Sequence, residues 1–136
     1  MTEDHHQIGE VADRVGLSLR TIRYYEEVGL VVPSGRTHGG FRLYTTADID
    51  RLSLVKALKP VGMSLETMGE LLRYADLLTK PDTRNREEVQ QRFQEVLTQA
   101  HRRCDELEGR LSEARQALAD VERLPLAVTR PSRGRG

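Results

Sequence analysis

The sequence predicts a mainly α-helical protein that joins a small N-terminal domain to one long C-terminal helix. Two short helical patterns flank a tight turn at Gly16-Leu17-Ser18, and a loop rich in proline and glycine follows them. Residues 83–123 contain no proline and only one glycine, which indicates a long uninterrupted helix. The 136 residues are 38% hydrophobic and 4% aromatic, a composition suited to a small core joined to a long polar helix.

The first two helices form a helix-turn-helix. Apolar residues at positions 8, 11, 12 and 15 recur at helical spacing, and Gly16 suits the end of that helix. Ser18 is a suitable N-cap for a second helix, which extends to about Val28 with Ile22 facing inward. The polar residues 1–6 are predicted to be disordered.

A small hairpin, or wing, is predicted next. Its first strand is Leu30-Val31-Val32 and its second is residues 41–44, with glycines and Pro33 between them. Alternation along the second strand puts Arg42 and Tyr44 on one outward face and turns Leu43 inward. Two further helices follow, with Thr46 and Ser64 as their expected N-caps.

The long helix carries an apolar stripe whose steps mostly alternate between three and four, as in a coiled coil. The step from Ala100 to Cys104 is an extra four, which indicates a stutter. A helix of roughly 60 Å cannot bury such a stripe against a small domain, so a second copy of the chain is the expected partner. The predicted homodimer interface consists of Val89, Phe93, Val96, Ala100, Cys104, Leu107, Leu111, Ala114, Leu118 and Val121.

Charge is balanced overall, with 21 basic and 21 acidic residues, but it is unevenly distributed. Between residues 14 and 44 only Glu26 and Glu27 oppose the arginines at positions 14, 20, 23, 36 and 42. Within that segment, arginines alternate with hydroxyl and aromatic residues from Arg20 to Tyr25, which is chemistry suited to phosphates and base edges. Tyr25 fits equally well as a core residue.

The sequence disfavours several other classes of protein. A single cysteine excludes a disulfide within the chain, and no apolar run reaches membrane length, so a cytoplasmic protein is expected. The sequence shows no nucleophile–base set, phosphate loop or metal-spaced cluster, so we expect no enzyme activity, no cofactor and no metal. Cys104 is expected to act as a small hydrophobic residue of the coiled coil, and a redox role across the dimer is the alternative.

Taken together, these segments resemble the MerR family of bacterial transcription regulators. The resemblance covers about residues 7–78, and a long terminal helix follows where that family has its dimerisation helix. The matching residues are Ile8-Gly9-Glu10-Val11-Ala12, Ser18 to Tyr25 with Glu26, Gly29-Leu30, Pro33, Gly40-Phe41-Arg42-Leu43-Tyr44, Asp48-Ile49 and Gly62-Met63-Ser64-Leu65-Glu66.

The resemblance implies a winged helix-turn-helix dimer joined by an antiparallel coiled coil. Its expected partners are double-stranded promoter DNA and RNA polymerase, and its expected location is the nucleoid. Such dimers bind a pseudo-palindromic operator and bend and untwist a promoter with a long spacer, so deformation of the DNA acts as the switch. About a dozen residues follow Leu124, which suggests a short member without a large effector domain, and a protein or small-molecule effector stays unidentified.

The resemblance also implies which residues contact DNA. The second helix enters the major groove, the wing meets the phosphates, and a lysine after the third helix adds a phosphate contact. The predicted DNA-binding residues are Ser18, Arg20, Thr21, Arg23, Tyr24, Tyr25, Arg36, Gly40, Phe41, Arg42, Tyr44 and Lys59.

The predicted organisation is a disordered segment (1–6), a winged domain (7–78), a linker with the long helix (79–124) and a disordered basic tail (125–136). The alternative function is a coiled-coil interaction module, or a repressor controlled by a protein partner, in which DNA binding is secondary.

Overall fold

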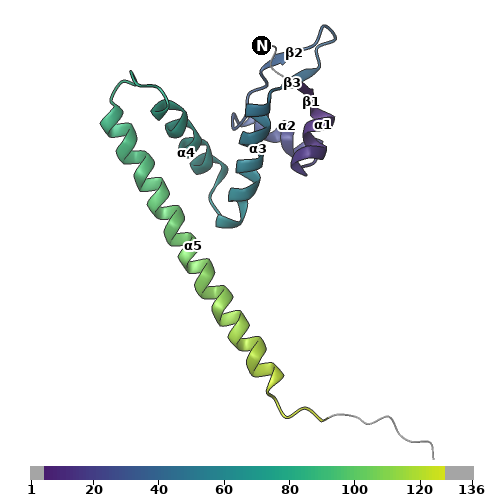
Figure 1. Cartoon of the computed structure of the whole chain (residues 1–136), viewed down its shortest axis with the longest axis vertical. Coiled ribbons are helices and arrows are strands. Elements are labelled where there is room, and N and C mark those ends of the chain that lie inside the picture. The colour runs from purple at the N-terminus through teal and green to yellow at the C-terminus, as the bar shows by residue number, and fades with distance from the viewer. Residues whose placement is uncertain (1–4, 128–136) are drawn as a thin grey trace, which may run out of the picture.

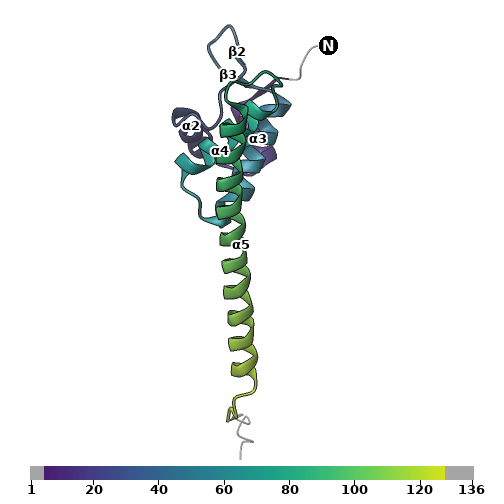
Figure 2. The same ribbon diagram turned by 90° about the vertical axis from the view of Figure 1, so that its left-hand side faces the viewer.

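A computed structural model describes residues 5–127. A compact N-terminal domain holds the short elements, and one long helix extends away from it (Figure 1). The wing projects at the end opposite to the free end of that helix (Figure 2). The elements are β1 (His6–Gln7), α1 (Ile8–Val15), α2 (Leu19–Glu27), β2 (Gly35–Arg36), β3 (Arg42–Tyr44), α3 (Thr46–Leu58), the 3₁₀ helix η1 (Lys59–Val61), α4 (Leu65–Leu78) and α5 (Arg86–Glu122).

The helix-turn-helix forms as the sequence predicts. Helix α1 ends at Gly16, whose φ of 77° suits a residue without a side chain. Lys56 of α3 donates a hydrogen bond of 2.9 Å to the carbonyl of Val15, which satisfies an unpaired group at this helix end. Ser18 caps α2 by accepting a hydrogen bond from the backbone N–H of Thr21.

The sheet has three short antiparallel strands in the order β1-β3-β2. Its first strand corrects the predicted disorder of residues 1–6, because His6 pairs with Tyr44. Residues 1–4 of that segment lie outside the described residues. The hairpin itself is also shifted from the prediction, since β2 consists of Gly35 and Arg36.

The prediction of a strand at Leu30-Val31-Val32 is wrong. Leu30 and Val31 are 2% and 1% exposed and belong to the core cluster. The backbone of Leu30 pairs with Tyr25 and with the side chain of Arg51 instead of with a strand. The apolar run therefore serves the core rather than a sheet.

The cap of α3 is one residue earlier than predicted. Thr45 has extended backbone angles and accepts a hydrogen bond from the N–H of Asp48, whose side chain accepts one from the N–H of Thr45. This reciprocal capping box uses Thr45 rather than Thr46 because Thr45 lies three residues before the acidic partner. The prediction that Ser64 caps α4 is confirmed by its hydrogen bond from the N–H of Thr67.

The core lies where α1, α2, α3 and α4 meet. Val11, Ile22, Leu52, Val55 and Met68 are each at most 1% exposed. Burying side chains of this size contributes about 1.5–3 kcal/mol each. Because Ile22 anchors α2 from its inner face, the opposite face of that helix is held outward in a defined orientation.

Helix α5 packs against α4 along its N-terminal half only (Figure 1). The side chain of Arg103 donates to the carbonyl of Val61, at the start of the connection to α4. Beyond this point α5 extends from the domain as a bare helix. The basic tail predicted from residue 125 is described only to Ala127, and its remainder lies outside the described residues.

The predicted dimer stripe divides into two parts that differ in exposure. The first four residues of the stripe are half-buried within one chain, because α4 folds back over this half of α5. These residues are Val89, Phe93, Val96 and Ala100. In contrast, Leu111, Leu118 and Val121 are 50%, 63% and 54% exposed. Cys104 is also exposed. Within residues 5–127, no helix is long and apolar enough to cross a membrane.

Candidate nucleic-acid interface

Helix α2 presents two faces of opposite character. Ile22 and Tyr25 are 0% and 2% exposed and point into the core. Arg20 and Arg23 are exposed, and Tyr24 is 49% exposed. The helical repeat explains the division, since residues three apart share a face. The outer face therefore offers two guanidinium groups and one phenol ring to a partner.

This placement gives Tyr25 a position in the core, and its predicted contact with DNA stays a prediction. Tyr25 lies three residues after Ile22 and is buried with it. Its hydroxyl is buried and has no hydrogen-bond partner among the described residues. The core role that the sequence also allowed is the one that Tyr25 has.

The hydroxyl groups at the start of α2 differ in their availability. Ser18 accepts from the backbone of Thr21 and donates to the Thr21 hydroxyl, with oxygens 2.8 Å apart. Ser18 is thus committed to capping the helix. The Thr21 hydroxyl accepts that bond and retains its own proton, so it is free to donate to a partner.

The tip of the wing is closed by its own hydrogen bonds. Arg36 donates to the carbonyl of Gly40 at 3.1 Å, and the hydroxyl of Thr37 accepts from the N–H of Phe41. Gly40 has a φ of 81°, which favours a residue without a side chain. Phe41 is 65% exposed beside it. The wing therefore presents Arg36, Gly40 and Phe41 together at its outer end.

The base of the wing is clamped to α2 by Glu26. Its carboxylate accepts from the Nε atom of Arg42 at 2.7 Å and from the hydroxyl of Tyr44 at 3.0 Å. We call Glu26, Arg42 and Tyr44 the wing clamp. These contacts join residues 16 and 18 positions apart in the sequence. The clamp fixes the orientation of the wing relative to the outer face of α2.

The wing clamp contains two residues that were predicted to contact DNA. Tyr44 is fully buried, whereas Leu43 is only half-buried, the reverse of the predicted alternation. Arg42 donates its Nε–H to Glu26 and its side chain is 35% exposed, so its contact with phosphate stays a prediction. Sequence reasoning treated Glu26 only as a charge opposing the arginines. The position of Glu26 directly after an inward-facing tyrosine, within a basic segment, was the signal for an internal partner.

The wing clamp also shifts the acidity of its members. Burial raises the pKa of Tyr44 to about 12, and the hydrogen bond to Glu26 adds to the effect. The hydrogen bond and charge of Glu26 also raise the pKa of Arg42. Both groups therefore stay protonated and keep donating to Glu26 near neutral pH.

We expect Tyr44→Phe to lower the free energy of unfolding by about 1.5–3 kcal/mol, the range for a hydrogen bond to a charged group. The raised pKa stabilises the fold below pH 10, and this contribution is lost as the pH rises through about 12. The variant should therefore show a smaller loss of stability between these values. Urea unfolding at several pH values measures both effects. Tyr24→Phe, which removes an exposed hydroxyl, is the control, and an equal loss in the two variants would contradict the clamp.

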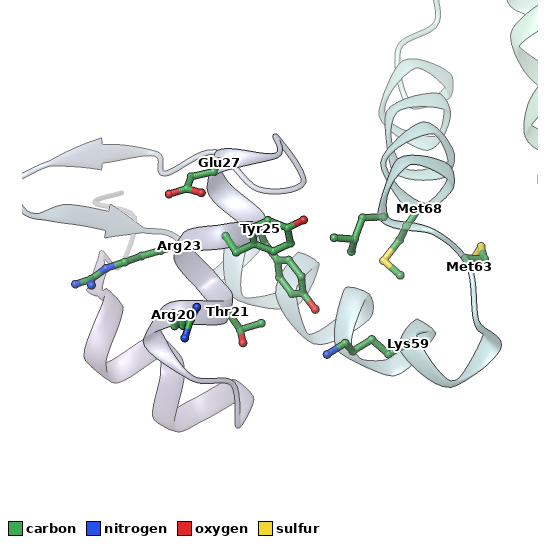
Figure 3. A pocket seen from close by; sticks show the side chains of 10 residues that line it. Arg20, Thr21, Arg23, Tyr25, Glu27, Lys59, Met63 and Met68 are labelled. Carbon is green, nitrogen blue, oxygen red and sulfur yellow. The ribbon is translucent and has the colours of Figure 1, made fainter.

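A hollow of about 980 Å³ lies between α2 and α4. Figure 3 shows Lys59 reaching from η1 toward α2, while Met63 and Met68 lie on the other side of the space. The hollow brings five predicted residues of α2 together with Lys59, whereas the wing residues lie outside this group. Its lining residues are Arg20, Thr21, Arg23, Tyr24, Tyr25, Glu27, Lys59, Met63, Leu65 and Met68.

The described residues carry no evident metal centre. Among residues 5–127, no group of three or more histidine, cysteine, aspartate or glutamate side chains is arranged to hold a metal ion. The arrangement on α2, η1 and the wing is that of a surface with exposed cationic and aromatic groups.

Comparisons with known proteins agree with this arrangement. Residues 7–75 match the family described as MerR HTH family regulatory protein. The chain is 36% identical over 118 residues to the transcriptional regulator CueR of Salmonella typhi, covering 87% of this chain and 80% of that protein. It is 34% identical over 123 residues to ZntR of Escherichia coli K12, covering 88% and 77%.

Solved structures show the same fold. HiNmlR, described as a MerR family regulator lacking the sensor domain and bound to promoter DNA, superposes with a TM-score of 0.66 and 29% identity. The match covers 88% of this chain and 91% of HiNmlR. These relatives are regulators rather than enzymes, in agreement with the sequence-based prediction. The chain belongs to the MerR family of helix-turn-helix transcriptional regulators.

Proposed function

We propose that this protein regulates transcription as a homodimer that binds a pseudo-palindromic operator within a promoter, together with RNA polymerase, in the cytoplasm at the nucleoid. The observation that carries the proposal is the outward face of α2, where Arg20, Arg23 and Tyr24 are exposed while Ile22 anchors the helix in the core. The similarity to HiNmlR, which was solved with promoter DNA, supports it.

The exposed groups divide into two roles. Arg20, Thr21, Arg23 and Tyr24 enter the major groove, where arginine recognises guanine and hydroxyl groups recognise several base edges. Arg36 and Gly40 of the wing, with Phe41 beside them, lie against the phosphate backbone. Lys59 adds a phosphate contact on the other side of α2. Phosphate contacts orient the protein on the DNA, and base contacts select the sequence.

The distal stripe consists of the apolar residues of α5 from Leu107 onward: Leu107, Leu111, Ala114, Leu118 and Val121. We propose that it pairs with the same stripe of a second copy in an antiparallel coiled coil, with Cys104 as a small apolar residue beside it. Helix α4 covers the preceding half of α5, so the distal stripe is the part that needs a partner. Pairing places two α2 helices at a fixed separation on the DNA.

A fixed separation makes DNA deformation a switch. The operator must bend and untwist to contact both α2 helices. This deformation of the DNA costs a few kcal/mol, and that deformation energy controls the activity of the promoter. The wing clamp supports this role because it holds the wing rigidly against α2. Two rigid DNA-binding domains impose their separation on the DNA instead of changing their own conformation to fit it.

A salt titration tests operator binding. Two exposed cationic side chains per protomer, Arg36 and Lys59, give roughly four phosphate contacts in a dimer. The logarithm of the association constant should then fall against the logarithm of salt concentration with a slope of about −4. Fluorescence anisotropy of a labelled operator found by genomic mapping of bound promoters measures this slope. A slope near zero would remove the phosphate contacts.

The exposed distal stripe also favours a second candidate, a coiled-coil module that binds a different protein. In that case the purified chain would sediment as a monomer and would bind DNA weakly and with little salt dependence. A dimer in sedimentation, together with a steep salt slope, favours the regulator acting on DNA.

A further inference from the structure

The hydroxyl of Tyr25 has no function in the interface described above. The side chain is 2% exposed, and its oxygen has no hydrogen-bond partner among residues 5–127. Buried hydroxyl groups are ordinarily paired, because removing one from water without a partner costs free energy. Phenylalanine would fill the same core position without that cost. The hydroxyl therefore points to a partner from outside the chain.

Tyr25 faces the hollow between α2 and α4 (Figure 3). Met63, Leu65 and Met68 give this space apolar walls. Its volume of about 980 Å³ lies within the range of small-molecule sites. Methionine side chains rearrange readily, so a small rotation at the walls makes the buried hydroxyl reachable.

The rim of the hollow favours a negative charge. Arg20, Arg23 and Lys59 contribute three cations, whereas Glu27 contributes one carboxylate. All four side chains are exposed, so they can turn toward a bound group. The half-exposed ring of Tyr24 adds an aromatic surface at the entrance, suited to packing against another flat ring.

We propose that this hollow binds a small planar aromatic anion. Its ring packs between Tyr24 and the methionine walls, its charge lies at the cationic rim, and one of its acceptor atoms receives the hydrogen bond of the Tyr25 hydroxyl. The rim residues Arg20 and Arg23 are also the proposed DNA contacts, so the anion and the operator exclude each other. This regulatory consequence rests on the proposed function, whereas binding of the anion does not.

The first experiment measures, by calorimetry on the free protein, the binding of naphthalene-2-sulfonate, a planar aromatic anion that serves as the probe. Tyr25→Phe should raise the Kd for the probe about tenfold, which corresponds to the loss of one hydrogen bond to a charged group. Met63→Glu, which places a carboxylate in the hollow, should raise the Kd further. Tyr74→Phe is the control, because Tyr74 is a buried tyrosine of α4 that does not line the hollow. This variant should bind the probe as the wild type does. An unchanged Kd in Tyr25→Phe would overturn the proposal.

The second experiment adds labelled operator DNA. The probe should release the operator from the wild type, and about tenfold more probe should be needed for Tyr25→Phe. Without the probe, Tyr25→Phe should bind the operator as the wild type does; a loss there would assign the hydroxyl to DNA and overturn the proposal. If the wild type binds no operator at all while Tyr25→Phe weakens probe binding, the proposed function fails and the binding site stands.

Discussion

Replacing Leu111 and Leu118 by aspartate together should convert the protein into a monomer and weaken operator binding by about 10²–10⁴-fold. Both side chains are at least half exposed in a single chain, so the substitution leaves the protomer fold intact. In the proposed dimer they are buried against a second copy, where unpaired carboxylates are costly. Loss of the dimer removes the gain in operator affinity that comes from linking two DNA-binding domains.

Sedimentation and operator titration measure the two effects. Ser112→Asp with Gln116→Asp is the matched control, because these residues lie on the opposite face of α5 and add the same charge. The control should remain a dimer with wild-type operator affinity. Dimers of the Leu111/Leu118 variant at the same concentration would show that the distal stripe is not the interface.

Replacing Arg23 by alanine should weaken operator binding by about 1–3 kcal/mol, the value of one good contact to a base edge. Arg23 is exposed on α2, and within residues 5–127 no acidic side chain forms an ion pair with it. Its guanidinium is therefore available for paired hydrogen bonds to guanine. The loss should be large for the cognate operator and small for non-specific DNA.

The salt dependence separates two roles for Arg23. A base contact leaves the slope of the salt titration unchanged and reduces discrimination between sequences. A phosphate contact reduces the slope by about one and weakens binding to all sequences alike. Arg102→Ala, on the exposed surface of α5 away from the distal stripe, is the control and should alter neither quantity. Wild-type affinity and discrimination in Arg23→Ala would remove this residue from the reading surface.

Most predictions that depended on local spacing held, although the cap of α3 is Thr45 rather than the predicted Thr46. The caps at Ser18 and Ser64, and the end of α1 at Gly16, agree with the structure. Each depends on residues within four positions, where a backbone N–H and a side-chain oxygen meet whatever the rest of the chain does. The outward placement of Arg20 and Arg23 likewise follows from the helical repeat.

Predictions failed where the outcome depended on how another helix or strand packs against the segment. The alternation of side chains along β3 led to the prediction that Tyr44 faces outward. The two-residue repeat of a strand establishes only that Leu43 and Tyr44 face opposite sides of the sheet. Which side is buried depends on where α2 packs, and Glu26 of α2 attracts the Tyr44 side. The strand expected at Leu30 failed for a similar reason, since a short apolar run is compatible with either a strand or a core segment.

The sequence by itself determined the helix-turn-helix, the long C-terminal helix and the cationic face of α2, because these follow from spacing within one element. Only the tertiary structure decided which residues that face leaves free. It committed Arg42 to Glu26, buried Tyr25 beside the hollow, and covered the first half of the apolar stripe with α4. Contacts between residues far apart in the chain depend on how whole elements pack, and local periodicity does not encode that packing.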